Sequence, residues 1–176
     1  MRIYLMLTLL VLAGCRKKPE LPVIGTVPEF SLIDQSGQPF SSKRLAGKVW
    51  IADMIFTNCP GACLRMASQM KRVQTATGDG VRLVSFTVDP DRDQPALMAA
   101  YARRYQADAA RWTFLTGPRE ELDKVSTAFL LGKIGLEHST RFVLVDGQSR
   151  LRATYQTDEL DAVERLLSDV AGLQGK

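Results

Sequence analysis

Residues 49–63 read VWIADMIFTNCPGAC, and this stretch decides the fold class. Residues 49–56 are mostly apolar, with β-branched and aromatic side chains, which is typical of a strand buried on both faces. Pro60 follows Cys59, and proline is favoured in the first turn of a helix, so we expect a helix to begin near Cys59 or Pro60. Apolar positions then recur at helical spacing, at Cys63, Met66, Ala67, Met70 and Val73. The stretch predicts a buried strand that passes into a helix.

Further strands are expected on both sides of this stretch. A small hairpin is predicted over residues 30–40, where an Asp-Gln-Ser-Gly turn joins two short segments. The other predicted strands cover residues 81–88, 112–115, 141–145 and 151–155. An Asp-Gly turn joins the last two, which predicts an antiparallel pair.

Helices alternate with these strands. They are predicted over residues 96–105, 119–131 and 158–173. Asp93 is expected to cap the first of them. The last is amphipathic, with one face formed by Leu160, Val163, Leu166, Leu167 and Val170. This order predicts an α/β fold with a parallel layered sheet and one antiparallel edge, similar to the thioredoxin-like fold with an N-terminal β-hairpin extension.

The amino terminus is typical of an export signal. The apolar run over residues 3–14 is shorter than the roughly 20 residues that span a bilayer as a helix. It ends in Leu-Ala-Gly-Cys, which resembles a bacterial lipobox with Cys15 as the lipidated residue. We expect a lipoprotein signal peptide over residues 1–14 and an exported, membrane-anchored lipoprotein that faces the periplasm or extracytoplasmic space. A soluble exported protein cut nearby and an uncleaved anchor are the alternatives.

Residues 15–27 are expected to form a lipidated tether, and residues 28–176 the folded domain. The tether begins with Arg-Lys-Lys and carries Pro19 and Pro22, so we expect a semi-extended segment without a regular element. The basic trio is either solvated or rests on anionic lipid headgroups of the membrane.

The charge distribution excludes nucleic-acid binding. The chain has 23 basic and 19 acidic residues, and four of the basic ones lie within the first eighteen positions. The remaining 19 basic residues balance the 19 acidic ones. A nucleic-acid-binding domain requires a basic face of its own.

Cys59 and Cys63 are the candidate reactive pair. Residues four apart on a helix share a face, so both sulfurs can point at one spot. A helix amino terminus favours negative charge, which should lower the pKa of the Cys59 thiol especially. Such a pair suits a disulfide or a soft metal ion, and a plain structural disulfide is the alternative.

His138 is the single histidine of the chain. Two sulfurs and one imidazole form a reasonable ligand set for copper, as Cu(I) and/or Cu(II). His138 shortly precedes the strand at 141–145, and in a thioredoxin-like fold the loop entering that strand faces the start of the cysteine helix. A loop histidine satisfied by the backbone is the alternative. Met54, Met66, Met70 and Met98 are expected to fill the core or surface rather than bind copper.

The chain resembles the Sco (SenC) family of copper-delivery proteins. The resemblance covers residues 28–148 and is carried by PEFSLIDQSGQPFSSKRLAGKVW, FTNCPGAC, TVDPDRDQP, RWTFLTG and HSTRFVLVDGQ. It implies a thioredoxin-like metallochaperone, with Cys59, Cys63 and His138 as ligands, that delivers copper to the copper-centre subunit of cytochrome c oxidase. A copper donor protein and a thiol reductant are possible further partners. Leu64 stands where the family often has proline. Asp89, Asp91 and Asp93 are expected to serve in turns and caps, and the alternative that the resemblance offers is that Asp89 tunes the metal site from nearby.

Two other activities share this fold. A thiol–disulfide oxidoreductase would use the pair Cys59 and Cys63, linked as a disulfide when oxidised, and would not need His138. A peroxidase is disfavoured, because peroxiredoxins place threonine three residues before the reactive cysteine, whereas Thr57 is two before Cys59. Fold alone does not choose between these activities.

Overall fold

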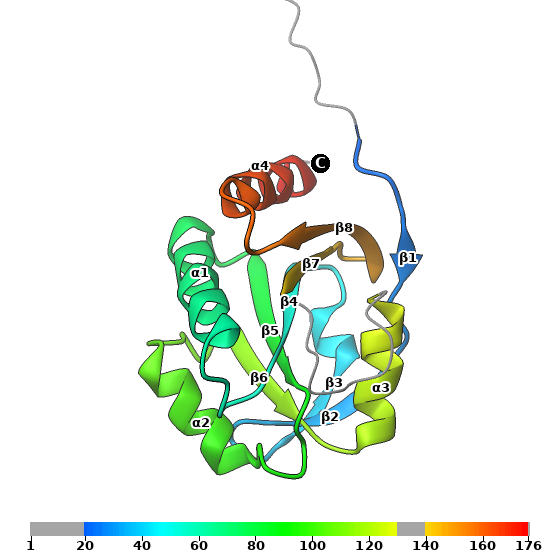
Figure 1. Cartoon of the computed structure of the whole chain (residues 1–176). Helices are drawn as coiled ribbons and strands as arrows, with labels where there is room; N and C mark the ends of the chain where they lie inside the picture. Colours follow the sequence, from blue (N-terminus) through cyan, green and yellow to red (C-terminus); the bar gives the residue numbers. More distant parts are fainter. Residues whose placement is uncertain (1–19, 130–139, 176) are drawn as a thin grey trace, which may run out of the picture.

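The computed structural model describes residues 20–129 and 140–175. These residues form a single mixed sheet in the order β1-β8-β7-β4-β5-β6-β2-β3 (Figure 1). Its strands are β1 (Gly25–Thr26), β2 (Ser31–Asp34), β3 (Pro39–Ser41), β4 (Val49–Ile55), β5 (Val81–Thr87), β6 (Trp112–Thr116), β7 (Arg141–Val145) and β8 (Arg150–Gln156). The helices are η1 (Ser42–Leu45), α1 (Ala62–Ala76), α2 (Pro95–Arg104), α3 (Arg119–Ala128) and α4 (Ala162–Gln174).

The predicted layering is confirmed. Strands β4, β5 and β6 run parallel at the centre, and β7 and β8 continue the sheet antiparallel beyond β4. The hairpin β2–β3 joins the opposite edge, where Ile33 pairs with Thr116 of β6. The N-terminal extension is therefore part of the main sheet.

Strand β4 is buried on both faces, as its apolar sequence predicts. Its alternate residues Ile51 and Ile55 lie in the core that α1, α2 and α4 cover. Trp50 and Met54 lie in the second core, beneath α3 and the hairpin. The four methionines predicted as fillers, Met54, Met66, Met70 and Met98, are all fully buried core residues.

Two helices begin later than the sequence pattern predicts. Helix α1 begins at Ala62 rather than near Cys59, because Gly61 before it has φ −146° and ψ −85°, outside the helical region. Helix α4 begins at Ala162, and Leu160 is fully exposed instead of lying on the buried face. The residues after β8 form turns, with the Ala162 N–H donating to the Glu159 carbonyl, and these turns carry Leu160 into solvent.

The expectation of no regular element before residue 28 is wrong for Gly25–Thr26, which pairs with β8 as β1. A buried arginine, Arg152, holds the residues that precede β1 by hydrogen bonds. Its guanidinium donates to the carbonyls of Leu21 and Pro22 and pairs with Asp146 at 2.8 Å. The last part of the predicted tether is thus attached to the sheet, whereas Cys15 lies outside the described residues. Among those residues, none of the helices is long and apolar enough to span a bilayer.

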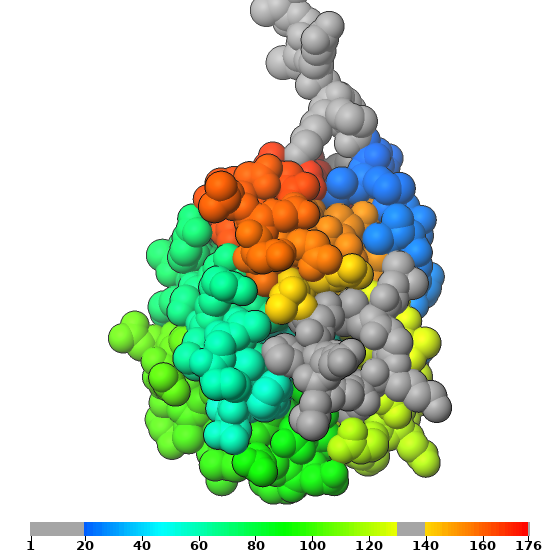
Figure 2. All heavy atoms as spheres, viewed as in Figure 1, coloured from blue at the N-terminus to red at the C-terminus, as the bar shows by residue number. Residues whose placement is uncertain are grey.

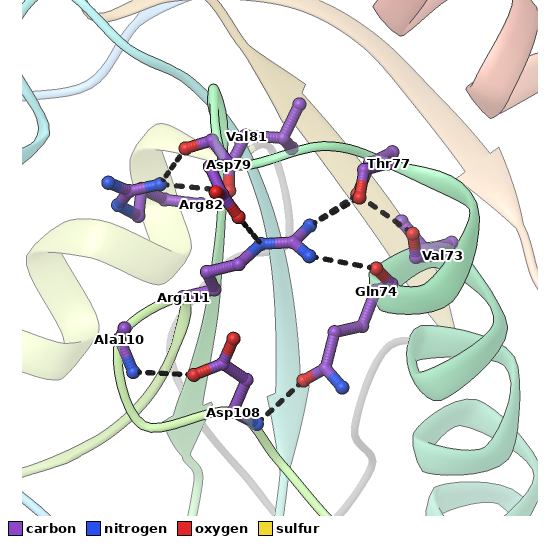
Figure 3. Close-up of polar contacts among 9 residues, drawn as sticks. All are labelled: Val73, Gln74, Thr77, Asp79, Val81, Arg82, Asp108, Ala110 and Arg111. Carbon is purple, nitrogen blue, oxygen red and sulfur yellow. Dashed lines mark hydrogen bonds and ion pairs between the residues drawn. The ribbon is translucent and has the colours of Figure 1, made fainter.

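Arg111 closes the carboxyl end of α1 (Figure 3). It donates to the Gln74 carbonyl at 3.1 Å and to the carbonyl and hydroxyl of Thr77, both at 2.8 Å. Asp79 lies 3.9 Å from the same guanidinium, and the Gln74 side chain accepts the Asp108 N–H at 2.8 Å. Because the last turn of α1 has no basic residue of its own, Arg111 supplies donors to carbonyls that the helix leaves unpaired. This contact fixes α1 against the loop that enters β6.

Candidate functional site

The cysteine turn, residues 56–61, connects the end of β4 to α1. The Cys59 N–H donates to the Phe56 carbonyl at 3.3 Å, which closes a turn before the helix starts. Cys59 therefore precedes α1, and Cys63 lies in its first turn. The residues around position 60, in teal, lie on the face seen in Figure 2. The cysteine turn lies at the carboxyl ends of the parallel strands, where ligands bind in many α/β proteins.

The two sulfurs share one turn although only one of them is on the helix. The Cys63 N–H donates to the Cys59 Sγ at 3.3 Å. Both cysteines are present as thiols and both are buried, with 6% of Cys59 and none of Cys63 exposed. The structure thus describes the reduced pair, with Cys59 the outer member and Cys63 the inner one.

The pKa values of the two thiols move in opposite directions. Burial acts to raise the pKa of Cys59, but hydrogen bonds from the Cys63 thiol and from backbone N–H groups at the start of α1 outweigh it and lower the pKa below 9.0. This agrees with the prediction made from the helix terminus. Burial raises the pKa of Cys63 well above 9.0, and its hydrogen bond to Cys59 and the charge of Asp53 raise it further. Cys59 is therefore the more acidic thiol of the pair.

Asp53 is a buried carboxylic acid beneath this turn. It is 1% exposed and lies between Ile51 and Ile55 on the α1 side of β4. In the described part of the chain, neither carboxylate oxygen has a partner with hydrogen-bond geometry. Burial raises its pKa to about 7, and the nearby hydroxyl of Ser85 offsets only part of the rise. Its charge acts on Cys63 and on Tyr101, so the three groups form one electrostatic cluster.

Sequence reasoning missed Asp53 as part of the site. The signal was available, because it is the one acidic residue in the apolar run of residues 49–56. A fully buried carboxylate without a partner is rare, and such groups are concentrated at functional sites.

Asp93 holds the front of the cysteine turn. Its side chain is fully buried and accepts the Thr57 N–H at 3.1 Å, the Thr57 hydroxyl at 2.5 Å and the Thr87 hydroxyl at 2.6 Å. The prediction that Asp93 caps the following helix is wrong, because Gln94 is the residue before α2 and no side chain caps it. The carboxylate instead ties the turn to the end of β5. Asp93 therefore positions Thr57, which lies two residues before Cys59 in the chain.

Two neighbouring groups complete the described surroundings. The Tyr101 hydroxyl on α2 donates to the Cys63 carbonyl at 3.2 Å and fixes α2 against the first turn of α1. Asp89 pairs with Arg92 at 3.6 Å, and its N–H donates to the Thr87 hydroxyl at 2.9 Å. In the described residues, Asp89 thus contributes to the loop after β5.

His138, the predicted third ligand, lies outside the described residues. The strand that follows it, β7, runs antiparallel to β4, with Ala52 opposite Val143. Its first residue, Arg141, is therefore at the sheet edge where β4 ends and the cysteine turn begins. Thr140 lies beside this edge, since its carbonyl accepts the Thr157 N–H at 2.8 Å and the Thr157 carbonyl accepts the side chain of Gln69 from α1 at 2.9 Å.

The described residues thus supply two candidate sulfur ligands and no candidate third ligand beside them. Within residues 20–129 and 140–175, no three His, Cys, Asp or Glu side chains are grouped to hold a metal ion. The paired sulfurs suit a soft ion such as copper, since thiolates are its preferred ligands and one thiol already has a lowered pKa.

Comparison with known proteins identifies the family. The family model described as SCO1/SenC matches residues 22–174. A SCO1/SenC family lipoprotein from Bacillus anthracis str. Ames has a TM-score of 0.79 and 31% identity, with 87% of this chain and 97% of that chain covered. BsSco, a member of the Sco family of cytochrome c oxidase assembly proteins in which a disulfide switch was identified, has a TM-score of 0.76 and 27% identity, with 90% and 99% covered.

A copper-bound relative has the same fold. ScoI of Bradyrhizobium japonicum, solved with copper bound, has a TM-score of 0.70 and 24% identity, with 84% of this chain and 99% of that chain covered. These matches confirm the thioredoxin-like fold expected from the order of strands and helices. The match to the family model spans the cysteine turn and the whole described sheet. The chain belongs to the SCO1/SenC family.

Proposed function

We propose that this protein is a copper metallochaperone. It binds one copper ion, as Cu(I) and/or Cu(II), through Cys59, Cys63 and His138. It delivers the ion to the copper-centre subunit of cytochrome c oxidase during assembly. The observation that carries the proposal is the pair of sulfurs on one turn, with the Cys63 N–H only 3.3 Å from the Cys59 Sγ. The copper-bound relative and the assembly function of BsSco support the choice of ion and partner.

The register of the sheet supports His138 as the third ligand. Because β7 is antiparallel to β4, the chain enters β7 at the edge that carries the cysteine turn. Only two residues separate His138 from Arg141, the first residue of β7. His138 is therefore close in sequence to the end of β7 that lies at the edge with the cysteine turn.

The two thiols suit stepwise binding and release. Cys59, with its lowered pKa, offers a thiolate to the incoming ion, and Cys63 gives up its proton when the ion replaces it. In delivery, thiolates of the partner replace Cys59 and Cys63 on the ion one after the other. No change in the ion's oxidation state is required for this exchange.

A second function, thiol–disulfide oxidoreductase, is favoured by one specific observation. The dithiol pair has an outer thiol of lowered pKa and an inner thiol of raised pKa, which suits attack by Cys59 and resolution by Cys63. Cys59 attacks a disulfide of the partner and releases one of its thiols. Cys63 then attacks Cys59, which forms the Cys59–Cys63 disulfide and leaves the partner as a dithiol.

Copper titration tests the ligand set. Reduced protein should bind one equivalent of copper, His138→Ala should bind it more weakly with an unchanged circular-dichroism spectrum, and Cys59→Ser should lose binding. Glu137→Gln, one residue away, is the matched control and should bind like wild type. Equal affinity of wild type and His138→Ala would refute the three-ligand site. Retained disulfide exchange in His138→Ala would then favour the oxidoreductase.

We also propose that residues 1–14 are a lipoprotein signal peptide, that Cys15 is lipidated, and that the exported domain over residues 28–176 is held at the membrane by residues 15–27. A Bacillus anthracis relative of this family is a lipoprotein, which supports this proposal. The described chain begins beside α4, at the opposite end of the view from α2 (Figure 1). Labelling with a fatty-acid analogue should mark wild type and not Cys15→Ser, and equal labelling of both would refute lipidation.

A further inference from the structure

A groove runs between the cysteine turn and α2. It has a volume of about 560 Å³ and opens to solvent on one side. Residues of the turn form one wall, and α2 with the loop before it forms the other. The side chains used below are Thr57, Asn58, Arg92, Leu97, Tyr101 and Arg104. Asn58, which directly precedes Cys59 in the chain, is one of the lining residues, so the groove adjoins the cysteine turn.

The groove is basic with an apolar centre. Arg92 and Arg104 both line it, and residues 94–107, which include all of α2, contain no acidic side chain. Arg92, which is exposed, pairs with the half-buried Asp89 at 3.6 Å. The guanidinium of Arg104 lies 5.8 Å from the centre of the Tyr105 ring, and within the described residues no carboxylate pairs with it. Leu97 lines the groove and is 46% exposed, so it offers an apolar contact beside the two arginines.

The walls of the groove are fixed before anything binds. The buried Asp93 carboxylate holds Thr57 through two hydrogen bonds, and the Tyr101 hydroxyl holds α2 against Cys63. A partner that binds therefore does not have to order these elements. Ordering them on binding would cost free energy and lower the affinity.

We propose that this groove binds an acidic segment of the partner protein. The partner is the protein to which Cys59 and Cys63 pass copper or with which they undergo thiol–disulfide exchange. The proposal rests on the function proposed above, because it assigns the surface that receives the same partner. Carboxylates of the segment face Arg92 and Arg104, and an apolar side chain covers Leu97. Charge complementarity of this kind mainly raises the rate of encounter and sets the register of the two proteins.

The test uses two synthetic peptides that differ only in charge, with the sequences Glu-Glu-Leu-Cys and Gln-Gln-Leu-Cys. Each cysteine is activated as a 2-pyridyl disulfide. Attack by the Cys59 thiolate forms a bond to the peptide sulfur, breaks the S–S bond to the pyridine ring and releases pyridine-2-thione, whose absorbance reports the rate. Cys63 then attacks Cys59, which releases the peptide thiol and forms the intramolecular disulfide.

We expect the acidic peptide to react about tenfold faster than the neutral one at low salt, with the ratio falling towards one at high salt. Arg104→Gln should lower this ratio several-fold. Arg103→Gln is the matched control, because it removes the same charge from an exposed neighbour that does not line the groove, and it should keep the ratio of wild type. Equal rates for the two peptides, or equal effects of the two substitutions, would overturn the proposal.

Failure of this proposal is distinguishable from failure of the proposed function. Copper titration of wild type decides whether the protein is a copper carrier and does not involve the peptides. Charge selectivity without copper binding would leave the groove as the docking surface of an oxidoreductase. Copper binding without charge selectivity would leave the ligand set standing and refute the groove.

Discussion

Replacement of Asp53 by asparagine should make the reduced, metal-free protein more stable at neutral pH. The carboxyl group is 1% exposed, and in the described part of the chain neither of its oxygens has a partner with hydrogen-bond geometry. Burial raises its pKa from 3.8 to about 7 in the folded protein. Ionisation of this group is therefore easier in the unfolded chain than in the folded one.

The sign and the size of the effect follow from that difference. Between pH 3.8 and about 7 the folded state holds a proton that the unfolded state has lost, so the unfolding free energy falls as the pH rises. Above about pH 7 the full penalty of about 4 kcal/mol is present. An asparagine amide removes this pH dependence. Its own buried polar atoms cost about 1–3 kcal/mol if they stay unpaired, so we expect a net gain of about 1–3 kcal/mol at pH 8.

Urea unfolding with a thiol reductant, followed by circular dichroism at several pH values between 4 and 8, measures this difference. Asp158→Asn is the control, because Asp158 is exposed and should show little change. The stability gain of Asp53→Asn over wild type should grow with pH through this range. If the two unfolding curves stay parallel from pH 4 to pH 8, or if the variant is less stable at pH 8, the buried carboxyl does not behave as argued.

Three further predictions concern the turn and the start of the described chain. Iodoacetamide should label Cys59 before Cys63, with a half-maximal rate below pH 9.0, because the pKa of Cys59 is lowered and that of Cys63 is raised; peptide mass spectrometry reads the order, and equal labelling would contradict it. Asp93→Asn should lower the unfolding free energy by about 1.5–3 kcal/mol through weaker hydrogen bonds to the turn, whereas an unchanged urea midpoint would exclude this role. Arg152→Met should cost about 3–5 kcal/mol, because it leaves the buried Asp146 without its main partner. Burial acts to raise the pKa of Asp146, but hydrogen bonds, led by that from Arg152, lower it. The stabilisation by the Asp146–Arg152 pair is therefore present above pH 3.8 and is lost as the pH falls further. The acid unfolding curve of Arg152→Met should lack this loss.

Local patterns in the sequence were sufficient for the elements and their order. The apolar run over residues 49–56 became β4 with one residue fewer, and the segment at 141–145 became β7 with the predicted bounds. Element ends were less predictable. Helix α1 starts after Gly61 instead of near Cys59 or Pro60, because the turn that carries Cys59 occupies the intervening residues.

Contacts between distant residues had to come from the tertiary structure. Asp93 reaches Thr57, 36 positions away, and its local sequence indicated only a helix cap. Arg152 holds the carbonyl of Pro22, 130 positions away, so a stretch with the composition of a linker is attached to the sheet.

The sequence by itself determined that two cysteines four residues apart follow a buried strand, and that a single histidine precedes another strand. Periodicity and spacing carry this information, because they depend on neighbours along the chain. Only the tertiary structure decided that Cys59 lies before the helix, that Cys63 lies buried in its first turn, and that Asp53 is a buried acid near them. Burial and electrostatic environment depend on which distant elements pack together, and no local pattern records that.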